Sequence, residues 1–243
     1  TNPCGVAASH STMKDPLVEI FKRALSCDPQ SAFGGIVACN CEVDGPSAKA
    51  MSELFLECIV APGFNKEARE FLQTKKNLRL VKIAAPQSDH KDLELRSIYG
   101  ALLVQTKDQS RAVKESEWRI PTKTKIKDPQ MSQDLDFAMT VAKHVKSNAI
   151  VLARNLTTIG VGAGQMSRID ATKVAFMKAS EFKHATAGSV LASDGFFPFS
   201  DCARLAHEQQ VAAIIQPGGS IRDEESIGYC DQVGLPMVFS GKR

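Results

Sequence analysis

The sequence has little net charge, few aromatic residues and no long apolar run. Its 30 basic and 27 acidic side chains leave a formal charge of +3 over 243 residues, so nucleic acid is not an expected partner. No apolar stretch reaches the roughly 18–20 residues that a membrane-spanning helix needs, so we expect no membrane association. The segment Thr1–Ser11 has neither the basic start nor the apolar centre of a secretory signal. These absences favour a globular α/β or similar domain of ordinary composition.

Cysteine pairs with metal-binding or redox spacing are also missing. The seven cysteines form no C-x-x-C pair, and Cys39 and Cys41 are too close in sequence for a good chelate. An H-x-E motif with a downstream C-x-x-C, the signature of zinc deaminases, is absent, so we predict no metal. Several cysteines lie in apolar stretches, which predicts buried, reduced thiols and a cytoplasmic location.

What the sequence does contain is an alternation of short apolar runs and amphipathic segments. Strands are expected at 34–39, 58–62, 78–85, 100–105, 148–153, 157–164, 189–193, 211–215 and 235–239. Helices are expected at 15–25, 47–57, 65–75, 132–145, 167–183, 201–209 and 223–233. This order predicts an α/β fold with mostly parallel sheets.

One polar segment interrupts the alternation. Residues Thr106 to Gln133 are rich in lysine and show little periodicity. They fit a solvated connector, with at most one edge strand, better than they fit an anion-binding segment. We therefore expect a first lobe over 1–105, a connector over 106–131 and a second lobe over 132–243.

Two segments that follow expected strands are candidates for ligand contacts. Gln216–Asp223 contains two glycines and opens a helix, so it is either an anion site or a tight turn. Ser193–Asp201 places three phenylalanines between Asp194 and Asp201, which fits core packing or the binding of a flat heterocycle. The glycines of 160–164 lack the G-x-G-x-x-G spacing of a dinucleotide site.

Two single residues also stand out. Asn148 begins an otherwise apolar strand, where its amide must find hydrogen-bond partners. Arg168 lies at the start of a long helix and opposes the helix dipole, so a bound carboxylate or phosphate would compensate its charge.

Taken together, these motifs resemble those of the AICAR transformylase family. The resemblance runs in order from end to end through NPCGVA (2–7), DPQSAFGGIVA (28–38), IVAP (59–62), KSNAI (146–150), GAGQMSR (162–168), SDGFFPF (193–199) and QPGGSIRD (216–223). In this family the transformylase domain is the C-terminal part of a bifunctional AICAR formyltransferase and IMP cyclohydrolase of purine biosynthesis.

The resemblance implies two cytidine-deaminase-like α/β/α lobes without zinc, and a homodimer with active sites at the subunit interface. It implies transfer of a formyl group from the cosubstrate 10-formyltetrahydrofolate to AICAR, giving FAICAR. The AICAR contacts carried over by motif are Gly34, Glu57, Asn148, Phe196 and Arg243. The folate contacts are Arg168, Asp201, Ser220 and Ile221. Asn148 would act in catalysis as a donor to the oxyanion or contact the carboxamide of AICAR.

Parts of the family pattern fall outside this chain. The family's Lys-His motif, which supplies its general base, comes immediately before the motif that begins here at Thr1, and relatives continue past Arg243. We therefore expect a fragment that does not turn over AICAR by itself. The alternatives are a non-catalytic ligand-binding or dimerisation fragment of that enzyme, and an unrelated nucleotide-binding α/β enzyme, which the glycine spacing disfavours.

Overall fold

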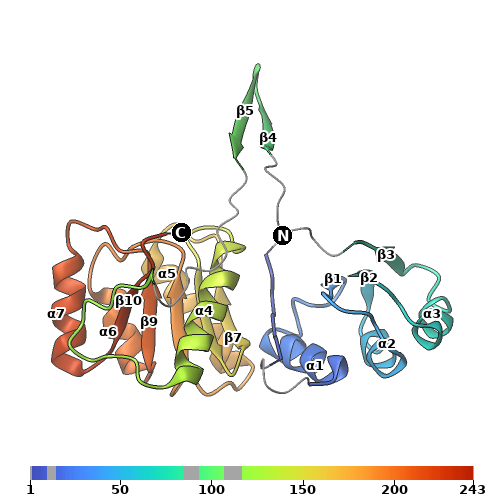
Figure 1. Ribbon diagram of the computed structural model, residues 1–243, viewed down its shortest axis with the longest axis horizontal. Coiled ribbons are helices and arrows are strands. Elements are labelled where there is room, and N and C mark those ends of the chain that lie inside the picture. The colour runs from blue at the N-terminus through green and yellow to red at the C-terminus, as the bar shows by residue number, and fades with distance from the viewer. Residues whose placement is uncertain (1, 10–14, 85–92, 107–116, 243) are drawn as a thin grey trace.

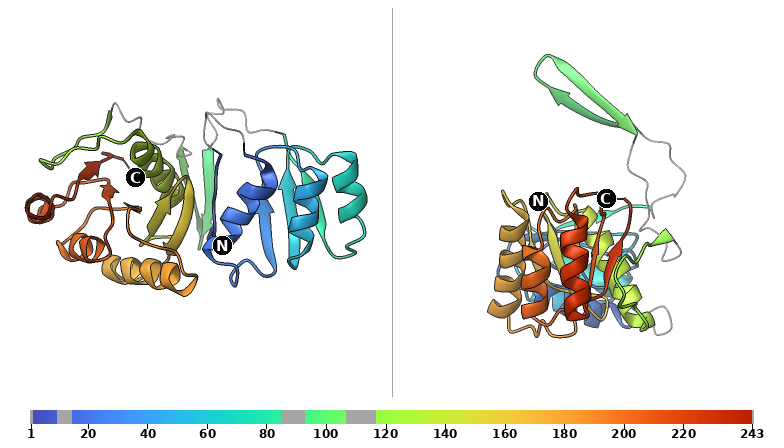
Figure 2. Two further views of the ribbon diagram at one scale, coloured as in Figure 1. Left: turned by 90° about the horizontal axis from the view of Figure 1, so that it is seen from below. Right: turned by 90° about the vertical axis from the view of Figure 1, so that its left-hand side faces the viewer.

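The computed structural model describes residues 2–9, 15–84, 93–106 and 117–242. Two α/β lobes lie side by side, and a two-stranded hairpin projects away from both (Figures 1 and 2). The first lobe contains α1 (Leu17–Cys27), β1 (Gly35–Ala38), α2 (Gly45–Ser52), β2 (Leu56–Ala61), α3 (Lys66–Leu72) and β3 (Arg79–Lys82). The hairpin consists of β4 (Leu93–Ile98) and β5 (Ala101–Thr106). The second lobe contains α4 (Pro129–Lys143), β6 (Ile150–Arg154), β7 (Thr157–Gly162), α5 (Arg168–Glu181), β8 (Val190–Ser193), α6 (Asp201–Glu208), β9 (Ala213–Gln216), α7 (Asp223–Val233) and β10 (Met237–Phe239).

The second lobe has three layers. Its sheet has the order β10-β9-β8-β6-β7, in which β6 runs antiparallel to both neighbours and the remaining pairs are parallel. Because side chains alternate along a strand, Ile150 and Leu152 pack against α5, α6 and α7, whereas Val151 and Ala153 pack against α4. The predicted α/β fold is confirmed, with β6 as the exception to parallel pairing.

The first lobe has helices on one face of its sheet. The parallel strands β1, β2 and β3 share a core with α1, α2 and α3, and Val37 and Leu80 pack against it. Their neighbours Ile36 and Val81 point to the opposite face and are exposed. The third layer expected for this lobe is not present among the described residues.

Two local expectations about the first half are wrong. The helix expected over 47–57 ends at Ser52, and β2 begins at Leu56, so Glu57 lies on a strand. The sequence pattern also missed β4, which pairs with β5 in an antiparallel hairpin. No helix within the described ranges has the length and apolar character needed to cross a membrane.

The start of the chain extends the sheet of the second lobe. Ala7 forms an antiparallel bridge with Thr157, and the amide of Thr158 donates to the carbonyl of Val6 at 2.9 Å. Arg119 pairs in the same way with Phe239, so a residue from the middle of the polar connector forms an edge contact on β10. The lobe boundaries at 105 and 131 remain a prediction, but both outer edges of this sheet carry segments from outside 132–243.

All seven cysteines are free thiols, and their burial differs. Cys27, Cys202 and Cys230 are buried, and burial raises the pKa of Cys202 and of Cys230 to about 12. Cys41 is exposed, so the prediction of buried thiols is wrong at that position, and Cys4, Cys39 and Cys58 are only partly buried.

An ion pair joins the two lobes. The ammonium of Lys178 on α5 lies 3.2 Å from the carboxylate of Asp28, just after α1, and only 10% of the Asp28 side chain is exposed. Burial alone would raise the pKa of Asp28, but hydrogen bonds from Ser31 and Lys178 lower it below the ordinary value of 3.8. Burial likewise opposes the charge of Lys178, yet Asp28 and Glu181 raise its pKa above 10.5. The pair therefore stabilises the folded chain between these pH limits.

We predict that Asp28→Asn lowers the free energy of unfolding at pH 7 by about 1–3 kcal/mol, because Lys178 loses a largely buried charged partner. The loss should shrink at pH 3, since below about pH 3.8 the unfolded wild type takes up a proton at Asp28 and the advantage of the ionised folded form declines. Urea unfolding at both pH values measures the difference. Glu19→Gln is the control, because the exposed Glu19–Lys22 pair should contribute about 0.5 kcal/mol or less. An equal loss at both pH values would contradict the electrostatic origin.

Candidate functional site

Four segments of the second lobe meet at one edge of its sheet. Because β6 runs antiparallel to β7 and β8, the residues that enter β6 lie beside the residues that leave β7 and β8. The register aligns Ile150 with Gly162 on one side and with Ser193 on the other. The loop after β9, which runs parallel to β8, ends at the same edge. This edge is where open α/β sheets bind their ligands.

Arg168 is the centre of this edge. Its Nη1 donates to Asp194 Oδ1 at 2.6 Å and to Ser193 Oγ at 2.9 Å, and its Nη2 donates to Asn148 Oδ1 at 2.8 Å. The side chain of Arg168 is 12% exposed and that of Asp194 only 2%. The guanidinium therefore ties together the residues that enter β6, leave β8 and begin α5.

Asp194 is held from several sides. It accepts hydrogen bonds from the backbone amide of Ala149 at 2.9 Å and from the hydroxyl of Ser147, in addition to Arg168. Burial alone would raise the pKa of Asp194, but the hydrogen bonds from Ser147, Arg168 and Ala149 lower it below its ordinary value. The carboxylate is thus an internal partner of Arg168. The expected external carboxylate or phosphate is not needed to compensate the charge of Arg168.

Both the oxygen and the nitrogen of the Asn148 side-chain amide form hydrogen bonds within the protein. Its oxygen accepts from Arg168, while Nδ2 donates to the carbonyl oxygens of Gln165 at 2.9 Å and Met166 at 3.2 Å. These bonds connect the entry to β6 with the loop before α5. The geometry makes Asn148 a residue that fixes the orientation of Arg168, and its role as a donor to the oxyanion or a contact to the carboxamide of AICAR stays a prediction.

Apolar side chains project from the loops around this cluster. Phe197 is fully buried, but Phe196 and Phe199 are about half exposed, so only part of the three-phenylalanine segment is core. Met166 and Ile221 are almost fully exposed on neighbouring loops. The arrangement offers apolar faces beside a buried charged cluster, which suits a flat polar ring.

In the loop after β9, backbone amides donate hydrogen bonds to side chains of the same loop. Gly218 and Gly219 have φ values of 75° and 97°, and the amide of Gly219 donates to the carboxylate of Asp223 at 2.7 Å. Ser220 Oγ accepts from the amide of Arg222 at 3.1 Å. These contacts favour the tight-turn interpretation of Gln216–Asp223 over an anion site.

The structure brings most of the predicted site residues of the second lobe to this edge. Asn148, Phe196, Ser220 and Ile221 lie on its loops, and Arg168 begins α5. Asp201 begins α6, where its Oδ1 accepts from the amide of Cys202 at 2.8 Å. Sequence reasoning gave no role to Ser147 or Ser193, and it left the segment of Asp194 open between core packing and ligand binding. The motifs KSNA and SDG contain these residues, but only tertiary structure shows which residue each one binds.

The predicted site residues of the first lobe lie on a different sheet. Gly34, with φ of +70°, precedes β1 and donates its amide to the carbonyl of Phe55 at 2.8 Å. Glu57 is exposed on β2, and its carboxylate lies 3.9 Å from Arg79. Arg243 lies outside the described residues. Within those residues, no group of three or more His, Cys, Asp or Glu side chains is placed to hold a metal ion.

The beginning of the chain is anchored close to Asn148. Asn2 Oδ1 accepts a hydrogen bond from the backbone amide of Lys146 at 2.8 Å. Beside this contact, a cavity of about 190 Å³ opens between the lobes, lined by Asn2, Pro3, Cys4, Cys27, Asp28, Ser31, Val161, Ala163 and Lys178. The N-terminal segment is therefore in reach of the same sheet edge.

We predict that Asp194→Asn lowers the free energy of unfolding by about 3–5 kcal/mol, because it leaves the largely buried charge of Arg168 without its carboxylate. Chemical denaturation at pH 7 measures this loss. The matched control is Glu181→Gln, which removes an exposed carboxylate of the same lobe and should cost about 1 kcal/mol or less. Similar losses in both variants would show that the buried pair stabilises the fold no more than an exposed ion pair does.

Comparison with curated proteins identifies similar chains over the whole length. A protein of Prochlorococcus marinus named "Bifunctional purine biosynthesis protein PurH" is 50% identical over 244 residues, which covers 100% of this chain and 45% of that relative. A protein of the same name from a Cyanothece species is 49% identical over 243 residues, with the same coverage. The chain thus spans a little under half the length of the curated relatives it matches.

A family model gives the same result. The model described as "AICARFT/IMPCHase bienzyme" matches residues 1–178, which include the first lobe, the hairpin and the second lobe through most of α5. This match covers more than half of the chain, and it includes Asn148 and Arg168. The chain therefore belongs to the AICARFT/IMPCHase bienzyme family.

Proposed function

We propose that this chain is part of an enzyme that transfers a formyl group from 10-formyltetrahydrofolate to AICAR, giving FAICAR in the cytoplasmic synthesis of IMP. The observation that carries the proposal is the buried cluster of Arg168, Asp194 and Asn148 beside the exposed ring of Phe196. The family membership and the relatives named for purine biosynthesis support it.

The chemistry requires a fixed charged donor near the reacting groups. The 5-amino group of AICAR is a poor nucleophile because its lone pair is delocalised into the ring, so a base must remove a proton as it attacks. The formyl carbon passes through a tetrahedral oxyanion, which preorganised donors stabilise. Arg168 is such a donor at the second-lobe edge, and Asn148 holds its guanidinium in place.

In this proposal, each lobe contributes ligand contacts. The folate would contact Arg168, Asp201 and the Ser220–Ile221 turn. AICAR would contact Asn148 and Phe196 in the second lobe, and Gly34 and Glu57 in the first, together with Arg243. The exposed side chains of Phe196 and Ile221 supply apolar surface for the two ring systems.

The general base is expected from the Lys-His motif that family members carry just before the motif starting at Thr1. The hydrogen bond between Asn2 and Lys146 holds Asn2 next to the turn that leads into Asn148. A base attached there would lie close to Arg168. This supports formyl transfer by the longer protein over a purely binding role for this segment.

We predict that Arg168→Gln in the full-length enzyme lowers formyl transfer by about 100-fold or more, because it removes a charged donor from the site. The assay follows FAICAR formation from AICAR and 10-formyltetrahydrofolate. Cyclization of added FAICAR to IMP should stay unchanged, which controls for the amount of enzyme, and a cooperative thermal unfolding transition controls for folding of the mutated lobe. Lys173→Gln, an exposed change on the same helix, is the matched control.

The same assay on the 243-residue chain distinguishes the alternative of a non-catalytic fragment. Ligand-induced thermal stabilisation without turnover supports a binding fragment that needs the preceding residues. Turnover by the short chain would overturn the assignment of the base to the Lys-His motif. Full formyl transfer by the Arg168→Gln enzyme would overturn the proposed role of Arg168.

We also propose that the chain functions as a homodimer in which the hairpin covers a surface of the second copy. In the register of β4 and β5, Leu93, Leu95, Leu102 and Val104 share one face. Each of these four side chains is about half exposed or more. The opposite face carries Glu94, which binds Arg96 and Gln105. An isolated two-stranded hairpin is marginally stable in water, so its apolar face requires a cover.

We predict that Leu95→Glu dissociates the homodimer, because it places a charge at the centre of the apolar face. Sedimentation velocity at micromolar concentration measures the change from dimer to monomer. Leu103→Glu is the matched control, since Leu103 is similarly exposed but lies on the opposite face of the hairpin. A monomeric wild-type chain, or equal dissociation by both variants, would contradict this arrangement.

A further inference from the structure

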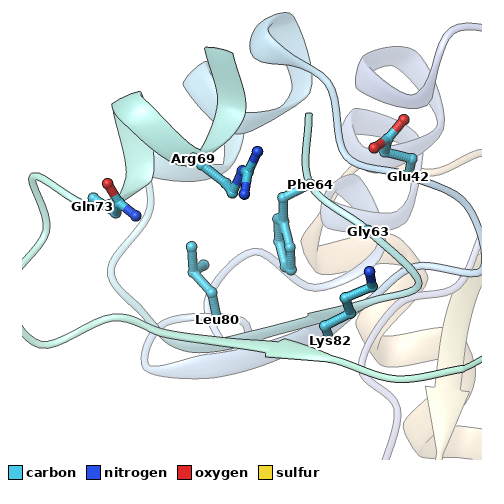
Figure 3. Close-up of a pocket in the computed structure, with 7 residues that line it drawn as sticks. All are labelled: Glu42, Gly63, Phe64, Arg69, Gln73, Leu80 and Lys82. Carbon is cyan, nitrogen blue, oxygen red and sulfur yellow. The ribbon is translucent and has the colours of Figure 1, made fainter. Parts of the chain in front are cut away.

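The first lobe contains a second cavity. It lies at the other end of the strands from Gly34 and Glu57, the first-lobe residues proposed to contact AICAR. The cavity has a volume of about 440 Å³ and is lined by Glu42, Gly63, Phe64, Arg69, Gln73, Leu80 and Lys82 (Figure 3). Its size is within the range of small-molecule sites. Glu57 lies near the start of β2, whereas Gly63 and Phe64 follow its end. The cavity is therefore at the opposite edge of the sheet.

The position follows from the parallel topology of the lobe. The strands β1, β2 and β3 all end at this edge, which places Glu42, Phe64 and Lys82 around one opening. The loops are fixed to each other, because the amide of Val43 donates to Gly63 at 3.0 Å and the amide of Asn65 donates to Val43 at 3.0 Å. The lining is thus held by backbone hydrogen bonds.

Opposite charges face this cavity without pairing. Within the described part of the chain, the side chains of Glu42, Arg69 and Lys82 form no ion pair or hydrogen bond with one another or with other residues. Figure 3 shows the ring of Phe64 between Arg69 and Lys82, with Glu42 and Gln73 at opposite ends of the cavity. The space between the charged groups is therefore open to a ligand.

The chemistry of the lining defines a class of ligand. Arg69 suits a carboxylate, and Gln73, the C-cap residue of α3, lies one helical turn further on, so that both can reach it. Glu42 suits an ammonium group, and Phe64 and Leu80 supply apolar contacts between the charged ends. From this arrangement, we propose that the cavity binds a small zwitterion of the amino-acid type with an apolar side chain.

The test titrates the 243-residue chain with L-phenylalanine and follows the amide resonance of Gly63 and the methyl resonances of Leu80 by NMR. Saturable shifts at these two residues are expected. Phenylacetate, which lacks the ammonium group, and phenethylamine, which lacks the carboxylate, should each bind about tenfold more weakly or worse, because each loses a charge-assisted hydrogen bond.

Variants assign the two charged ends. Arg69→Gln should raise the Kd of L-phenylalanine about tenfold or more, and Glu42→Gln should abolish the preference for L-phenylalanine over phenylacetate. Lys75→Gln, a change of the same charge outside the lining, should leave the Kd unchanged. The absence of shifts at Gly63 and Leu80 in the wild type would overturn the site. Equal binding of all three probes would overturn the ligand class. Neither result bears on formyl transfer, which depends on other residues.

Discussion

The edge of the second lobe depends on the ion pair between Arg168 and Asp194. An arginine in the first turn of a helix opposes the helix dipole, and a buried guanidinium without a partner would be strongly destabilising. The carboxylate of Asp194 offsets both effects, and it also accepts hydrogen bonds from Ser147 and from the amide of Ala149. A single carboxylate thus joins the start of α5, the entry to β6 and the exit from β8. The arrangement of Asn148 and of the loop that carries Phe196 follows from this contact.

The sequence predicts the second lobe better than the first for a physical reason. Its central strands are buried on both faces and appear as short, continuous apolar runs such as Ile150–Ala153, between helices with clear caps such as Ser167. The strand β4, by contrast, mixes apolar and charged residues and packs against no core within the described residues, so its pattern carries little information. The sequence also does not predict that helices cover only one face of the first-lobe sheet. Ile36 and Val81 have the pattern of core residues in the sequence but are exposed in the structure.

The location of the site was more predictable than the roles of its residues. The family resemblance supplies Asn148, Arg168, Phe196 and Ser220 as site residues, and the segments that carry them lie next to strand ends, which share an edge. The partner of Arg168 is 26 residues away in sequence, beyond the reach of any local pattern. For this reason the unfavourable position of Arg168 suggested an external anion, whereas the structure supplies Asp194. The same applies to Asn2, whose contact with Lys146 spans 144 residues.

In the proposed homodimer, a second copy of the chain would both complete the formyl-transfer site and bury the exposed apolar surface. Gly34 and Glu57 lie on the first-lobe sheet, and Glu57 has Arg79 as its ion-pair partner, so these residues are not bonded to the cluster around Arg168. Close to Gly34, the ring centroids of Phe33 and Phe55 lie 5.2 Å apart. Phe55 is half exposed, and Phe33 and Ile36 are more exposed still. Exposed apolar surface of this extent typically marks an interface. A partner that covered Phe33, Ile36 and the apolar face of the hairpin could place its second-lobe edge opposite Glu57. Under the proposed function, dimerisation and assembly of the site would therefore be the same event.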